Sequence, residues 1–354
     1  MSHDYSSPQN SSHPRRAGRG RWLLAALLVM TTGCAQPQGG LLRPEPVPVP
    51  APEPAIQLSA QPGRLVFSGT QTGTGAGASP VQTVTLQNSS DAPVRLTGVT
   101  FSMGAAFGLV SPPSFPLTLA AGASLDLGVK LLPGNPTGVL RATLRAVGDS
   151  AVGEVELAGL RAAGLEGDKE PALAQIVDAL GYQINVGGQG LILSTGDAPI
   201  GDEIAAPLFK RALTAVPVTL RPVARYSPDG LSAYGTFVLE GTVARTQVRG
   251  TLDMGGHQAL NPPLQPGSQT TFDPGAQAFG VYLAANGKYP TQDTYTLDRL
   301  NTGPVRHAVR VYPLKDGDGK VVPHSFLLAF EPSANGDYQD AVFVLENVDP
   351  VTAK

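Results

Sequence analysis

The stretch Val81–Phe101, VQTVTLQNSSDAPVRLTGVTF, decides the fold class. Its two ends, Val81–Asn88 and Val94–Phe101, are rich in β-branched residues and alternate apolar with polar side chains, as strands buried on one face do. The connection between them, NSSDAP, carries residue types that turns prefer. The stretch therefore predicts two strands joined by a turn.

The same pattern extends over residues 57–163. Further apolar or alternating runs are Arg64–Gly69, Ser124–Pro133, Gly138–Val147 and Gly153–Leu160. Turn-forming clusters separate them, and the chain as a whole holds 42 Gly and 33 Pro. Strands recurring this closely over about 100 residues predict an antiparallel β-sandwich of immunoglobulin type.

A resemblance makes this prediction more specific. Residues 57–163 resemble the abnormal-spindle/hydin-type immunoglobulin-like domain, itself similar to major sperm protein domains. The residues that carry the likeness are Pro62, Leu65–Phe67, Gln82–Asn88, Phe107, Leu119–Gly122 and Gly138. The resemblance implies scaffolding or adhesion without catalytic residues.

Residues 168–350 are expected to form a second and larger β-sandwich of jelly-roll character. Leu173, Ile176, Val177 and Leu180 follow helical spacing and predict one short helix that Gly181 ends. After it, strands are expected at Val216–Tyr226, Ala233–Val243, Ala278–Ala285, Arg306–Leu314, His324–Pro332 and Ala341–Val348. The whole chain is therefore predicted to be all-β, with two β-sandwich domains.

This second segment resembles the C-terminal module of large secreted bacterial proteins that often carry immunoglobulin-like, carbohydrate-binding or malectin-like domains beside it. The matching residues are Ile200–Pro207, Phe272–Gly275, Phe279–Gly280, Arg306–Arg310 and Asp337–Asp340. The resemblance implies a cell-surface or glycan context and supplies no catalytic residues.

The start of the chain has the features of a targeting segment. Four arginines precede the apolar run Trp22–Met30, which is long enough for a signal peptide and too short for a membrane span. Thr31–Cys34 resembles the lipobox of bacterial lipoproteins, although that motif usually carries Leu where Thr31 stands. The resemblance implies a signal peptide over residues 1–33 and a lipid on Cys34, the only cysteine of the chain. The alternative is a plain secretory signal with a stray cysteine.

Residues 34–56 are rich in proline and are expected to form an extended tether from a membrane anchor to the sandwiches. Residues 1–33 hold four Arg and one Asp, so the chain without them has 21 basic and 27 acidic residues and a net charge of −6. This balance argues against nucleic acid as a partner. Localisation at the cell envelope, with membrane contact through the lipid, is expected instead.

The segment Glu331–Asp340 holds the strongest candidate site. Glu331, Asn335, Asp337 and Asp340 are oxygen-bearing side chains of the kind that Ca²⁺ prefers, and the turn Lys315–Lys320 (KDGDGK) is a further source of oxygens. Two alternatives stay open: an aspartate before a strand often only caps backbone amides, and paired carboxylates also serve glycosidases.

A cluster of tyrosines offers a second candidate, because exposed aromatic rings line many sugar-binding sites. These are Tyr282, Tyr289, Tyr295 and Tyr312. Their alternative role is that of half-buried strand residues. The sequence thus favours a non-catalytic envelope lipoprotein that binds a glycan or an envelope protein, with calcium as the candidate ion. The competing hypothesis is an envelope polysaccharide hydrolase that uses the C-terminal acids.

Overall fold

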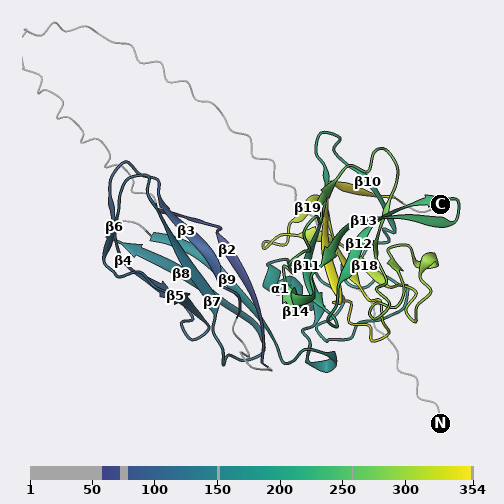
Figure 1. The fold of residues 1–354 in the computed structure, drawn as a ribbon, viewed down its shortest axis with the longest axis horizontal. Helices are drawn as coiled ribbons and strands as arrows, with labels where there is room; N and C mark the ends of the chain where they lie inside the picture. Colours follow the sequence, from purple (N-terminus) through teal and green to yellow (C-terminus); the bar gives the residue numbers. More distant parts are fainter. Residues whose placement is uncertain (1–57, 72–78, 150–151, 257, 352–354) are drawn as a thin grey trace, which may run out of the picture. The chain divides into compact units, whose positions relative to one another are not determined.

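The computed structural model describes residues 58–71, 79–149, 152–256 and 258–351 (Figure 1). The predicted signal peptide (1–33), the predicted tether (34–56) and Cys34 lie outside the described residues. Nearly all regular structure is β-strand, which confirms the predicted all-β sandwich fold.

The first part of the described chain contains two sheets. One is four-stranded, with the order β1 (Leu58–Gln61), β3 (Gln82–Asn88), β7 (Ser124–Leu131) and β5 (Phe107–Val110). The other has the order β2 (Arg64–Thr70), β9 (Val152–Ala162), β8 (Gly138–Gly148), β4 (Val94–Phe101) and β6 (Leu117–Leu119). Val84 and Val129 from the first sheet share a core with Leu144 and Val155 from the second. Shared burial of this kind is the basis of a β-sandwich.

The segment after β9 holds the predicted helix. Following a short turn η1 (Gly167–Lys169), helix α1 spans Leu173–Leu180, as the spacing of its apolar residues predicts. Gly181 ends it with a φ of 87°, a left-handed conformation that glycine adopts without steric cost. Arg64 of β2 donates a 2.9 Å hydrogen bond to the carbonyl of Ala179 in α1.

The remaining strands form two larger sheets and one short pair. The first sheet has the order β14 (Gln258–Leu260), β11 (Val218–Tyr226), β20 (Ala341–Glu346), β19 (Val321–Phe330) and β18 (Val309–Lys315), with β15 (Thr271–Phe272) also paired to β11. The second has the order β13 (Val243–Leu252), β12 (Ser232–Glu240), β16 (Gly280–Leu283) and β17 (Thr294–Tyr295). The short pair is β10 (Leu208–Arg211) with β21 (Val348–Val351), and two further turns are η2 (Met254–Gly256) and η3 (Asp298–Leu300).

Strand β20 is buried on both faces, which explains its continuous apolar run. Phe343 and Leu345 face a core shared with Tyr234 of the second sheet. The alternate residues Val342 and Val344 face a core shared with Ile176 of α1. Successive side chains of a strand point to opposite faces, so helix α1 covers one face of this sheet and the second sheet covers the other.

One predicted strand differs from the structure. The sequence predicts one continuous strand over Ala233–Val243, but the strand breaks at Gly241, which has a φ of 66° and turns the chain from β12 into β13. Strand β13 is largely exposed, so it lacks the apolar alternation from which a separate strand is recognised. The domain boundaries at 57–163 and 168–350 stay a prediction, since the described residues form one compact unit.

Candidate functional site

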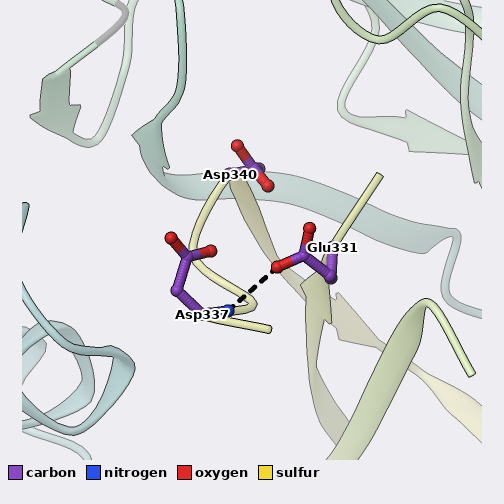
Figure 2. A group of neighbouring side chains, drawn as sticks. All are labelled: Glu331, Asp337 and Asp340. Carbon is purple, nitrogen blue, oxygen red and sulfur yellow. Dashed lines mark hydrogen bonds between the residues drawn. The ribbon is translucent and has the colours of Figure 1, made fainter. Parts of the chain in front are cut away.

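The candidate site lies in the loop between β19 and β20. Glu331 follows the last residue of β19, and the loop returns to the sheet at Asp340, directly before β20. Gly336 and Tyr338 both have left-handed backbone conformations, with φ of 82° and 55°. These two residues curl the loop so that Asp337 and Asp340 come together with Glu331 (Figure 2).

The Glu331 carboxylate organises the loop. Its Oε1 accepts a 2.8 Å hydrogen bond from the backbone amide of Ser333. Its Oε2 accepts from the backbone amides of Gly336 at 2.8 Å and Asp337 at 2.9 Å, the latter drawn in Figure 2. Successive amides that point at one anion form a stable anion-binding turn. Glu331 therefore defines the loop conformation in addition to bringing charge to it.

Asp337 and Asp340 each keep one oxygen without a partner. Asp337 Oδ2 accepts from Asn335 Nδ2 at 2.5 Å and Gln339 Nε2 at 2.9 Å, and Asp340 Oδ1 accepts from the hydroxyl of Tyr289 at 2.7 Å. Asp337 Oδ1 and Asp340 Oδ2 are buried and have no hydrogen-bond partner among the described residues. A buried oxygen without a partner is costly, so each such atom in a native fold calls for a ligand, water or ion.

The three carboxyls are also deeply buried. Glu331, Asp337 and Asp340 are only 0%, 1% and 6% exposed. Burial, together with the charge of Asp337, raises the pKa of Glu331 to about 7. Burial likewise raises the pKa of Asp337, and it raises that of Asp340 well above the ordinary value. In each case the main cause is loss of hydration of the charged form.

This donor set fits a divalent cation. One oxygen from each of Glu331, Asp337 and Asp340 lies within 4.8 Å of the other two. Calcium holds oxygens at about 2.3–2.6 Å, so two oxygens on one ion are at most about 5 Å apart, whereas for magnesium the limit is about 4 Å. Carboxylate oxygens are ligands that both ions accept, and the three oxygens lie within the limit for calcium.

A fourth acid, Glu170, adjoins this group and was missed by the sequence analysis. Its Oε1 accepts from Gln258 Nε2 at 2.7 Å, and its Oε2 accepts from Gln339 Nε2 at 3.1 Å. Burial raises the pKa of Glu170 to about 7. Glu170 lies 169 residues before Gln339 in the chain, and no local pattern connects the two.

Two other predicted sources of metal ligands, Asn335 and the turn Lys315–Lys320, do not add oxygens to the carboxylate group. Asn335 is exposed and faces Asp337 with its amide nitrogen, which is a donor and not a cation ligand. In the turn Lys315–Lys320, Asp316 Oδ1 accepts from the backbone amides of Asp318 and Lys320. Within the described residues, no acid of this turn belongs to the carboxylate group. That turn therefore has the hydrogen bonding of a capped hairpin connection.

The four candidate tyrosines do not form a common surface. Tyr312 is fully buried and donates its hydroxyl to the carbonyl of Val186. Tyr282 is 3% exposed and stacks on Tyr295, with ring centroids 5.8 Å apart. Tyr289 is directed at Asp340. These rings fill the interior between strands or hold the acid cluster in place.

A second charged group contacts the same loop through Tyr338. Arg310, fully buried, pairs with Glu203, whose other oxygen lies 2.7 Å from His307 Nε2. His307 Nδ1 lies 2.8 Å from Asp298 Oδ2. Although burial lowers it, the hydrogen bonds to Asp298 and Glu203 raise the pKa of His307 to about 9. The ring is therefore protonated at neutral pH and donates to both acids.

Tyr338 connects this charged group to the acid loop. Its hydroxyl donates a 2.8 Å hydrogen bond to the backbone carbonyl of His307. The Arg310 guanidinium lies 4.8 Å from the centre of the Tyr338 ring, a cation–π distance. Tyr338 stands between Asp337 and Asp340, so the same short loop carries the acids and supports His307 and Arg310.

Comparisons with known proteins found only weak structural similarity. No family model and no curated protein matches the chain. Among solved structures, WR4, a C. elegans MSP family member, is similar at 17% identity over 31% of this chain and 99% of its own, with a TM-score of 0.20. The secreted serine protease VesC from Vibrio cholerae is similar at 11% identity over 82% of this chain and 51% of its own, with a TM-score of 0.22.

Likenesses at this level carry no argument, and the chain spans only about half of the VesC chain. In the described part of the chain, no helix is both long and apolar enough to cross a bilayer. The strand pairing given above is what places the chain among all-β sandwich proteins.

Proposed function

We propose that this chain is a non-catalytic binding or scaffolding lipoprotein of the cell envelope, in which a calcium ion holds the loop before the last long strand. The observation that carries the calcium site is the buried group Glu331, Asp337 and Asp340, two of whose oxygens lack a partner among the described residues. Envelope attachment is supported by the signal-like start of the chain and Cys34. The partner we propose is a glycan or another envelope protein.

The burial of these three acids favours ion binding over hydrolysis as their role. Glycosidases place a sugar between two carboxyl groups that are about 5–9 Å apart. Here the side chains of the three acids are almost completely buried. A substrate has no access to such a group, whereas a desolvated ion fits it.

Thermal melting of the full chain tests the cation site. Calcium is expected to raise the melting temperature relative to chelator, since a ligand at a hundredfold excess over Kd adds about 2.7 kcal/mol to the free energy of unfolding. Asp337→Asn is expected to abolish the calcium effect. In chelator, the same variant is expected to be no less stable than the wild type, because it removes a buried charge.

Asp318→Asn is the matched control, because Asp318 is an exposed acid of the Lys315–Lys320 turn. It should keep the full calcium effect. Identical wild-type melts in calcium and chelator would show that the Asp337 loop is only a capped turn into β20, and the calcium site would be abandoned.

Lipid attachment is tested by Cys34→Ala in the producing cell. The wild type is expected in the membrane fraction with incorporated labelled palmitate, and the variant in the soluble fraction without label, because acylation needs the thiol. A wild type that is secreted without label would favour the plain secretory signal.

A further inference from the structure

A cavity of about 380 Å³ opens beside His307, away from the acid group. Its apolar wall includes Leu297, Val309 and Val311, and its polar groups include Asp197, Asp298, Arg299 and His307. Small-molecule sites typically measure about 300–1,000 Å³ and combine apolar walls with a few polar groups. The size and lining of this cavity fit that description.

Buried ion pairs and hydrogen bonds support the wall of the cavity at His307. The Glu203 side chain is 1% exposed and bonds His307 on one side and Arg310 on the other. Arg310 Nη2 donates to the carbonyls of Ser194 and Gly196. Both ring nitrogens of His307 are already bonded, Nε2 to Glu203 and Nδ1 to Asp298, so neither is free to bond a ligand in the cavity.

Charge in the lining is balanced. The lining residues include two acids, Asp197 and Asp298, and two bases, Arg299 and the protonated His307. Arg299 Nη1 donates a 3.2 Å hydrogen bond to the carbonyl of Thr242, which leaves its other N–H groups as the donors for a ligand. Asp197 is exposed, and the Asp298 side chain is 42% exposed, so both can accept hydrogen bonds from a ligand. A balanced lining favours neither a cation nor an anion, because either would meet a like charge.

We infer that this cavity binds a neutral, polyhydroxylated ligand of about one sugar ring. Hydroxyl groups both donate and accept, so they match carboxylates and a guanidinium at once. The carbon-bound hydrogens of a sugar ring would pack on Leu297, Val309 and Val311. This inference rests on the proposed binding function, to which it adds the class of ligand.

Saturation-transfer NMR on the full chain tests it with glucose, galactose, mannose and N-acetylglucosamine as neutral probes. Glucosamine and glucuronate are matched probes of the same size with positive and negative charge. At least one neutral sugar is expected to give a saturable signal that exceeds both charged probes. Asp197→Asn and Asp298→Asn are each expected to weaken it about tenfold, since each removes a charged acceptor.

Asp168→Asn, an exposed acid outside the cavity, is the control and should leave the affinity unchanged. Asp197→Asn safeguards the result if Asp298→Asn disturbs folding through His307. The inference is overturned if no neutral sugar gives a saturable signal, if the signal survives both cavity substitutions, or if a charged probe binds best. A calcium-dependent melt without sugar binding would overturn this inference alone, whereas a melt insensitive to calcium would remove the calcium site whatever the sugars do.

Discussion

Arg310→Met is expected to lower the free energy of unfolding by about 3–5 kcal/mol, the cost of removing one partner of a buried ion pair. Arg310 is fully buried, pairs with Glu203, and lies 4.8 Å from the Tyr338 ring. Its loss leaves the Glu203 carboxylate desolvated, with His307 as its remaining ionic partner. Urea unfolding at neutral pH measures the change.

Two variants complete this experiment. Adding Glu203→Gln to Arg310→Met removes the stranded charge, so the double variant should recover part of the lost stability. Arg145→Met removes an exposed pair with Glu154 and should cost less than about 1 kcal/mol. If Arg310→Met is no worse than Arg145→Met, the buried pair does not hold this part of the fold.

Stability is expected to fall as the pH rises from 6.5 to about 9, because His307 keeps its proton in the folded state. Its pKa is raised from the ordinary 6.5 to about 9. Below pH 6.5 both states are protonated and the full contribution is present; above it the unfolded state loses the proton first, so unfolding becomes easier. At about 1.4 kcal/mol per pKa unit the total loss is about 3 kcal/mol.

The measurement is a series of urea unfolding curves across this range, with calcium saturating so that protonation of the Glu331 group does not contribute. His307→Gln should flatten the profile above about pH 7, because Gln does not titrate and the pKa of Glu170, about 7, contributes only below that pH. His324→Gln, at an exposed pair with Asp349, should leave the fall intact. A wild-type profile as flat as that of His307→Gln would contradict the expected coupling to Asp298 and Glu203.

Local patterns made much of the fold predictable. Helix α1 and its end at Gly181 follow from apolar spacing and one glycine, both visible within nine residues. The run Ala341–Glu346 reads as a strand because both of its faces are buried. The sequence does not distinguish strand β13 from β12, because the largely exposed side chains of β13 do not alternate between apolar and polar.

The sequence likewise predicts the part of the candidate site that is local in the chain and not the part that comes from distant segments. Glu331, Asp337 and Asp340 fall within ten residues, so a curled loop was enough to bring them together. Glu170 and Tyr289 reach the same place from distant segments, and only the packed fold brings them near Asp337 or Asp340. The burial of Tyr282 and Tyr312 was equally inaccessible, because strand periodicity does not reveal what covers a face.

Tyr338 would couple the proposed calcium site to the His307 cavity. It sits in the backbone between two acids of the loop, and its hydroxyl holds the carbonyl of His307. If calcium binding changes the affinity of the cavity for its ligand through this contact, binding of that ligand must change the affinity for calcium by the same factor, since linkage is reciprocal. A sugar in the His307 cavity would then shift the midpoint of a calcium titration by the same factor by which calcium shifts that of the sugar.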